Sequence, residues 1–298
     1  GEKMKKTIFI GCVESSYVLL ECLLQHKYSV IGIITADNSK VNADFHSLVP
    51  LAEKYKIDYI CTKDINDRDT ITFIKSKNPE VIYCFGWSRL IKSELLSIPK
   101  YGVVGFHPAA LPANRGRHPL IWSLVLGLDK TASTFFIMDE GADTGDIISQ
   151  EEIIIDDTDD ANTLYNKVLE TAKKQILEFT AQFANGTVRR LPQDIGNGNT
   201  WRKRGQLDGQ IDWRMSCKGI YNLVRGLTHP YVGAHFLYGD KEIKVWKCEG
   251  IVSKEYQNIE PGKVLYVNSP KNYMVKVYDG IIHILDSDEV NLTEGEYL

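Results

Sequence analysis

Hydrophobic residues in the first half of the chain gather in short continuous runs that alternate with amphipathic stretches. Five of the runs have the length of buried strands: 6–11, 29–35, 58–62, 80–86 and 101–107. Three of the stretches between them carry apolar residues at helical spacing: 17–25, 48–55 and 69–77. Strands that are apolar on both faces are typical of parallel sheets covered by helices on both sides. The pattern therefore predicts a Rossmann-like α/β domain with a mostly parallel sheet, which binds its ligands beyond the carboxyl ends of the strands.

The middle of the chain continues this pattern. It predicts a helix over 118–127, strands over 131–139 and 146–155, and a long amphipathic helix over 162–183. Six apolar residues recur at helical spacing on the long helix: Leu164, Val168, Ala172, Ile176, Phe179 and Phe183. A stripe of this kind is interpreted as core packing and not as a ligand site.

The pattern changes after the loop signals NGT and IGNGNT, the second of which covers 195–200. We therefore place a catalytic domain over 1–195 and a second domain over 200–298. In the second domain, 210–227 is predicted to be helical. Short apolar runs separated by Gly and Asp turns follow this helix, and they are typical of a small OB-like β-barrel.

Composition narrows the class of protein. Of the 298 residues, 43% are hydrophobic and 25% are charged, and the net charge is −4, which argues against a general nucleic-acid binder. The six cysteines form no CxxC pair, so no metal site is expected, and reduced buried thiols of a cytoplasmic protein are the interpretation. No apolar run is long enough to span a bilayer, and no membrane partner is expected.

The residues with the clearest chemical potential are His107 and Asp143. His107 follows a predicted strand at the edge where this fold class binds ligands, and Asp143 lies in the glycine-flanked loop DEGADTGDII. An imidazole can accept a proton from an attacking amine near neutral pH, and a carboxylate can orient the ring and stabilise the imidazolium. Taken singly, each residue is better explained by a structural role, as a loop histidine or a turn-forming aspartate. Their combination at this edge favours a functional pair.

Five segments carry a family resemblance that covers nearly the whole chain: VIYCFGWSRLI, HPAALPANRGRHPL, GADTGDI, WRKRGQLDGQIDW and LTHPYVGA. The sequence resembles the folate-dependent formyltransferases, which include methionyl-tRNA formyltransferase, glycinamide ribonucleotide transformylase and the nucleotide-sugar N-formyltransferases. The resemblance implies transfer of a formyl group from N10-formyltetrahydrofolate to a primary amine. The last two segments resemble a carboxyl-terminal domain of the tRNA and sugar branches, which the glycinamide branch lacks.

The resemblance also assigns catalytic roles. His107 and Asp143 match the family's catalytic His and Asp, but the family's Asn falls on Gly105. That Asn donates a hydrogen bond to an oxyanion, and loss of one such donor costs a factor of roughly 100 to 1000 in rate. Another donor, such as Asn114, Ser88 or a backbone N–H, is the favoured replacement. A slower enzyme and a non-catalytic folate or nucleotide-sugar binder stay open.

Binding residues follow from the same resemblance. Residues expected at the folate donor are Phe85, Gly86, Trp87, Ser88, Leu90, Asp139 and Gly141. Residues expected at the acceptor are Arg115, Arg117 and His118, because arginines before a helix start favour phosphate.

The acceptor is expected to be a nucleotide-linked amino sugar. A tRNA-modifying member would need a basic footprint for the phosphate backbone. The family's tRNA branch carries a basic loop after the second strand, whereas TADNSKVNADFHS has one lysine and two aspartates here. The resemblance therefore favours the sugar branch, with no nucleic-acid partner and with a homodimer expected. Methionyl-tRNA formyltransferase and a hydrolase that gives the formyl group to water are the alternatives.

Overall fold

The computed structural model describes residues 5–37, 44–87 and 89–298. Ser88, expected at the donor, and 38–43, part of the segment that bears on the tRNA branch, lie outside the described residues. The chain divides into two compact units whose segments alternate along the sequence. The first unit comprises residues up to Gly116, Ala132–Ile153 and Lys167–Thr200, and the second comprises Arg117–Thr131, Ile154–Asn166 and Trp201–Leu298. The domain boundaries expected from the sequence, 1–195 and 200–298, stay a prediction.

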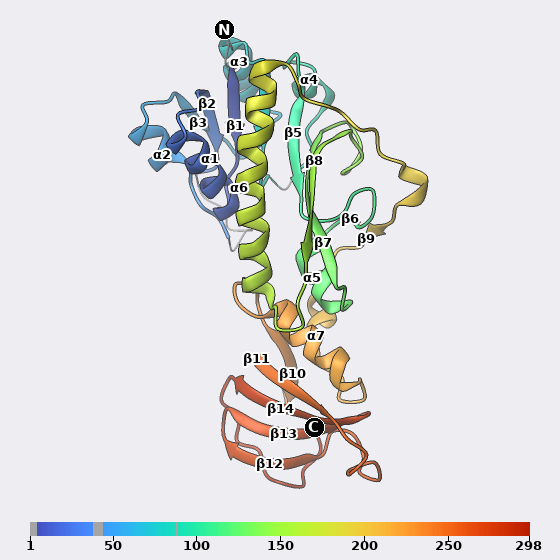
Figure 1. Cartoon of the computed structure of the whole chain (residues 1–298). Helices are drawn as coiled ribbons and strands as arrows, with labels where there is room; N and C mark the ends of the chain where they lie inside the picture. Colours follow the sequence, from blue (N-terminus) through green and yellow to red (C-terminus); the bar gives the residue numbers. More distant parts are fainter. Residues whose placement is uncertain (1–4, 38–43, 88) are drawn as a thin grey trace. The chain divides into compact units, whose positions relative to one another are not determined.

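The first unit is built on a seven-stranded sheet in the order β3-β2-β1-β4-β5-β7-β8 (Figure 1). Its strands are β1 (Thr7–Ile10), β2 (Val30–Thr35), β3 (Tyr59–Cys61), β4 (Val81–Cys84), β5 (Val103–His107), β7 (Lys130–Ile137) and β8 (Ile147–Ile154). The pairings from β3 through β5 are parallel, and β7 pairs with β5 in the antiparallel direction. The predicted mostly parallel α/β sheet is confirmed.

Alternate residues of the central strands enter two different cores, one on each face of the sheet. Phe9 of β1 packs in a core with residues of α1, α2 and α6, whereas Ile8 and Ile10 pack with residues of α3 and α4. The helices are α1 (Glu14–Gln25), α2 (Val49–Lys54), α3 (Arg68–Lys77), α4 (Ser93–Leu96) and α6 (Ala161–Asn185). Burial on both faces explains why these strands are continuously apolar in the sequence. The apolar stripe predicted on the long helix is buried throughout.

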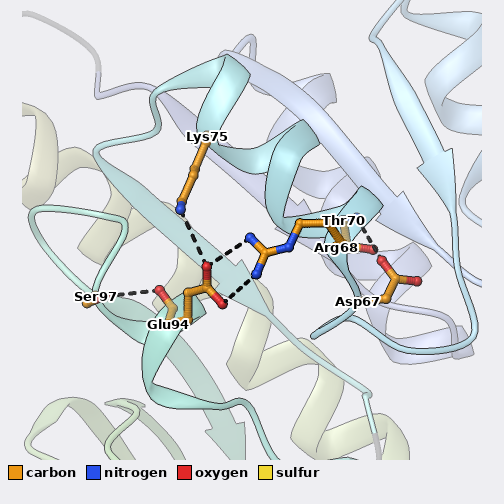
Figure 2. A network of polar contacts seen from close by, with 6 residues as sticks. All are labelled: Asp67, Arg68, Thr70, Lys75, Glu94 and Ser97. Carbon is orange, nitrogen blue, oxygen red and sulfur yellow. Dashed lines mark hydrogen bonds and ion pairs between the residues drawn. The ribbon is translucent and has the colours of Figure 1, made fainter.

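Polar contacts at the surface join α3 to α4 (Figure 2). The carboxylate of Glu94 receives the guanidinium of Arg68 at 3.1 Å and the ammonium of Lys75 at 3.4 Å. Asp67 caps α3 by accepting a hydrogen bond from the backbone N–H of Thr70 at 2.7 Å, and this bond is the main reason why the pKa of Asp67 is lowered. Because the ion pairs are exposed, apolar burial between the helices contributes more to stability than they do.

The second unit contains a five-stranded antiparallel sheet in the order β10-β11-β14-β13-β12. Its strands are β10 (Ala234–Tyr238), β11 (Lys241–Val252), β12 (Val264–Ser269), β13 (Asn272–Val277) and β14 (Gly280–Ser287). Two helices, α5 (Pro119–Val125) and α7 (Cys217–Leu227), contribute to its hydrophobic core. The small β domain predicted for the carboxyl-terminal part is confirmed as an antiparallel five-stranded sheet.

The helix predicted over 210–227 is shorter in the structure, because it begins at Cys217. Ser216 ends the preceding loop and caps α7, its Oγ accepting a hydrogen bond from the backbone N–H of Gly219 at 3.0 Å. Ile211, inside the predicted helix, instead donates its N–H to the carbonyl of His235 at 2.7 Å. None of the helices in the described part of the chain has the length and apolar character needed to cross a membrane.

Candidate active site

His107 ends β5, where the β4–β5–β7 part of the sheet meets the loop that follows. Its backbone pairs with Thr134 of β7, and only 5% of the residue is exposed. The hydroxyl of Thr134 donates to the carbonyl of Ala109 at 2.6 Å, and Gln150 Nε2 donates to the carbonyl of Leu111 at 3.0 Å. These bonds fix the loop after His107 to the two strands at the sheet edge.

Asp143 lies in the loop between β7 and β8 and faces the His107 ring. Its Oδ2 is 3.6 Å from His107 Nδ1, and it accepts a hydrogen bond from the backbone N–H of Gly116 at 3.1 Å. Asp143 has a φ of +59°, a left-handed conformation that aspartate tolerates better than most residues. Such conformations gather at functional sites, and here one aims a carboxylate at a buried imidazole.

The other ring nitrogen of His107 also has a partner. Nε2 lies 2.7 Å from the backbone carbonyl oxygen of Asn114. Because a carbonyl can only accept, this contact assigns the proton of the neutral ring to Nε2 and leaves the Nδ1 lone pair beside Asp143. The structure therefore brings together His107, Asp143 and Asn114, but it uses the Asn114 backbone for this contact. A side-chain donor role for Asn114 stays a prediction.

Gly105 lies on β5, two residues before His107, so a side chain there would point to the same face of the sheet. That space is already filled. An added Cβ would lie 2.9 Å from Met138 Cγ and 3.0 Å from Phe136 Cζ, closer than normal packing permits. Gly105, at the family's Asn position, therefore packs against Phe136 of β7 and Met138 just after it.

We expect Gly105→Asn to lower the free energy of unfolding by about 1–3 kcal/mol, because the added side chain must displace Met138. Adding Met138→Ala should recover part of this loss by opening space. Urea unfolding measures both effects. Gly205→Asn is the control, because nothing lies within 4 Å of a Cβ at that glycine. Wild-type stability of the single Gly105 variant would contradict the packing argument.

The turn after β4 holds the residues expected at the donor. Gly86 has a φ of +71°, and a Cβ there would collide with Val13 and Ser16, so the turn requires glycine. Trp87 is half-buried and packs beside Val13. Phe85 is 1% exposed with its ring in the core, which limits any ligand contact of this residue to its backbone. Leu90 is 66% exposed.

The loop from Asp139 to Gly145 is organised by its own side chains. Asp139 Oδ1 accepts hydrogen bonds from the backbone N–H of Gly141 at 2.9 Å and from the hydroxyl of Thr144 at 2.6 Å. A Cβ at Gly145 would collide with the carbonyl oxygen of Ile137. Asp139 and Gly141 thus shape the loop that carries Asp143, and their contact with a donor stays a prediction.

The residues expected at the acceptor fall into two groups. Arg115 belongs to the first unit, and its Nη1 donates to the carbonyl of Pro112 at 3.1 Å. Arg117 and His118 belong to the second unit, where Arg117 is exposed. Burial lowers the pKa of His118, and Arg117 and Arg204 lower it further. The positive charges of Arg117 and Arg204 beside His118 in the second unit suit an anionic ligand.

Sequence reasoning missed two residues, each of which contacts one of the two loops of the site. Gln193 donates to carbonyls of the Asp143 loop, and Asn199 accepts from the backbone of Asn114. The only sequence signal near them is the turn-forming IGNGNT stretch, which predicts a loop without indicating what the loop contacts.

Two formyl transferase family models match successive parts of this chain. The formyl transferase family model matches residues 23–180, and the formyl transferase C-terminal domain model matches residues 205–291. The chain is 31% identical to the bifunctional polymyxin resistance protein ArnA of Wigglesworthia glossinidia brevipalpis, over 88% of this chain and 40% of that protein. It is 28% identical to methionyl-tRNA formyltransferase of Caldanaerobacter subterraneus subsp. tengcongensis, over 94% of this chain and 91% of that protein.

Solved structures share the fold over almost the full length. WlaRD, a sugar 3N-formyl transferase crystallised with dTDP and 5-N-formyl-THF, has a TM-score of 0.70 at 19% identity, covering 98% of this chain and 100% of that one. The N-formyltransferase of Helicobacter canadensis, in complex with folinic acid and dTDP-3-aminofucose, has a TM-score of 0.70 at 18% identity, covering 95% and 100%. At this identity the likeness shows the fold alone.

Proposed function

The chain belongs to the formyl transferase family, and from this we propose that it moves a formyl group from N10-formyltetrahydrofolate to the primary amine of a nucleotide-linked amino sugar. The observation that carries the proposal is the 3.6 Å approach of His107 Nδ1 to Asp143 Oδ2 at the carboxyl edge of the sheet. The fold class binds ligands at this edge, and the pair provides a proton acceptor next to a ligand bound there.

The turn after β4 suits a flat, hydrogen-bonding ring such as a pterin. Gly86 lacks a side chain and is exposed, so a ligand can approach its backbone closely, and the half-buried Trp87 adds an apolar surface. We assign the donor to Gly86, Trp87 and the loop of Asp139 and Gly141, with Phe85 contributing through its backbone. The bound donor would supply the formyl carbon that the amine attacks. The bond from that carbon to N10 would then break, and tetrahydrofolate would leave as a neutral amine, its N10 taking the proton that the attacking amine had lost.

The His107–Asp143 pair is arranged to take the proton that the amine loses. The ring keeps its Nε2 proton on the Asn114 carbonyl, so the incoming proton goes to Nδ1. A proton on Nδ1 lies next to the Asp143 carboxylate, whose negative charge stabilises the imidazolium. Gly116 N–H fixes this carboxylate in place, because it donates to the same oxygen. The pair thus acts as the base of the proposed reaction.

The choice of a sugar acceptor is supported by charge and by relatives. The net charge of −4 gives little attraction to a tRNA backbone. The Helicobacter canadensis structure contains a dTDP-linked amino sugar and WlaRD contains dTDP. Within the first unit, Arg115 offers a guanidinium that suits a phosphate, and we assign it to the acceptor side. The acceptor roles of Arg117 and His118 stay predictions. Methionyl-tRNA remains the second candidate because of the relative that carries that name.

Turnover with a panel of acceptors tests the proposal. We expect the protein to consume N10-formyltetrahydrofolate and to formylate at least one TDP- or UDP-linked amino sugar, measured by mass spectrometry of the product. Charged initiator methionyl-tRNA in place of the sugar is expected to give no product. Formylation of the tRNA alone would assign the protein to that branch instead. Donor breakdown without acceptor would indicate a hydrolase, and binding of both ligands without turnover would indicate a non-catalytic binder.

A further inference from the structure

A single segment after α6 contacts both loops that carry the His107–Asp143 pair. This segment, residues 193–199, contains Gln193 at its start and Asn199 at its end. All of it belongs to the first unit, as do His107 and Asp143. Its two end residues reach the two loops separately, and each contact bears on a different member of the pair.

Gln193 holds the loop of Asp143. Its Nε2 donates to the carbonyl of Asp143 at 2.9 Å and to the carbonyl of Gly145 at 2.6 Å. Two carbonyl acceptors determine which end of the amide is the NH2 group. The Oε1 atom is enclosed and accepts no hydrogen bond from the described residues. Gln193 therefore serves this site as a double donor, and a side chain without N–H groups cannot replace it.

Asn199 holds the peptide that contacts His107. Its Oδ1 accepts from the backbone N–H of Asn114 at 2.8 Å, and its carbonyl accepts from the backbone N–H of Arg115 at 3.0 Å. Asn114 has a φ of +63°, and its carbonyl accepts from His107 Nε2. Gly198 packs so closely against Pro112 and Arg115 that a Cβ would collide with both. Asn199 thus sets the direction of the carbonyl that orients the imidazole.

We propose that Gln193 and Asn199, at the two ends of the 193–199 segment, position the two groups of the candidate active site, with Gln193 acting through Asp143 and Asn199 acting through His107. Neither residue reaches the reacting atoms itself, so both are positioning residues. The proposal deepens the proposed function and rests on it for the identity of the reaction. The geometric part concerns the ring of His107 and the loop of Asp143, and it can be measured without turnover.

Gln193→Glu tests the contact with the Asp143 loop. The substitution keeps the size of the side chain but faces two carbonyls with a carboxylate that cannot donate. We expect kcat to fall by about 10- to 100-fold, because small displacements of reacting groups carry penalties of this size. The KM for the donor should stay within about two-fold, because Gln193 makes no direct contact with it in the proposed arrangement. Gln182→Glu, the same change at a half-buried position of α6 outside the site, is the control and should retain wild-type kinetics.

Asn199→Ala tests the contact with the His107 loop. It removes the acceptor for Asn114 N–H, and we expect kcat to fall about 10-fold and the pH profile of kcat to change, since the imidazole loses a fixed orientation. Asn199→Asp keeps an acceptor oxygen and should restore most of the activity. Asn197→Ala is the control, because the Asn197 side chain hydrogen-bonds only to Asp194 among the described residues.

Nitrogen-detected NMR of the His107 ring gives a readout that does not depend on the reaction. The wild-type protein should show a slowly exchanging Nε2 proton, which Asn199→Ala loses and Asn197→Ala keeps. If these signals behave as expected while the wild type formylates no amino sugar, the positioning role holds and the proposed function fails. If Gln193→Glu and Asn199→Ala both keep wild-type kcat and wild-type ring signals, the positioning role is wrong.

Discussion

His107→Gln is expected to lower kcat/KM for formyl transfer by about 10²- to 10⁴-fold, the usual contribution of a positioned acid–base group. The glutamine amide can still donate to the carbonyl of Asn114, so the buried loop keeps its contact. It has no lone pair that can take the amine proton beside Asp143. The effect should therefore fall on kcat, while the affinity for the donor is retained.

Steady-state kinetics with the best amino-sugar acceptor, together with calorimetric binding of 5-formyltetrahydrofolate, measures this result. His26→Gln is the matched control, because His26 is exposed at the end of α1 and lies outside the site. A His107→Gln protein that binds donor and retains kcat within about three-fold of wild type would exclude the imidazole as the base.

Asp143→Asn is expected to lower kcat by about 10²- to 10³-fold, because a neutral amide cannot stabilise the imidazolium that forms when His107 takes a proton. The substitution is nearly isosteric, and its amide oxygen can still accept from the backbone N–H of Gly116. Asparagine also tolerates the left-handed conformation at this position as well as aspartate does. The loss should therefore be electrostatic and not structural.

Thermal unfolding and kcat, measured together, separate these causes. Asp146→Asn is the control: it lies just beyond the same loop, and its carboxylate pairs with Arg190 Nε at 3.1 Å in a partly exposed setting. Surface ion pairs contribute little to stability, so the control should keep the wild-type melting temperature and a kcat within about two-fold of wild type. A wild-type kcat for Asp143→Asn would remove the carboxylate from the mechanism, whereas a drop in melting temperature with the loss of activity would point to the loop.

The replacement of the family's Asn by glycine has a structural counterpart that the sequence alone does not show. Met138 and Phe136 fill the space that a side chain on Gly105 would need. Met138 directly follows β7 and lies far along the chain from Gly105 on β5, so no local sequence pattern links the two positions. The Gly105 position therefore offers packing in place of a donor, and in the proposed reaction the oxyanion would need a donor from another group.

Local pattern predicted most elements of the first unit, although it did not indicate the short helix α4. Continuous apolar runs predicted the strands, because the sheet is buried on both faces, and the stripe on α6 predicted its buried side. The motif stretches also placed His107 and Asp143 at one sheet edge. Local pattern failed where a cap overrides periodicity: Ser216 starts α7 later than the apolar spacing of 210–227 indicates.

Tertiary structure alone decided how the site is held. The partner of His107 Nε2 is a backbone carbonyl, and the partner of Asp143 Oδ2 is a backbone N–H. Every residue carries the first group and every residue except proline the second, so the sequence does not reveal which residue supplies them. Gln193 and Asn199 reach the site from beyond α6, through a few individual hydrogen bonds that leave no periodic pattern in the sequence. Sequence encodes burial through repetition, whereas one-to-one polar contacts between distant residues exist only once the chain has folded.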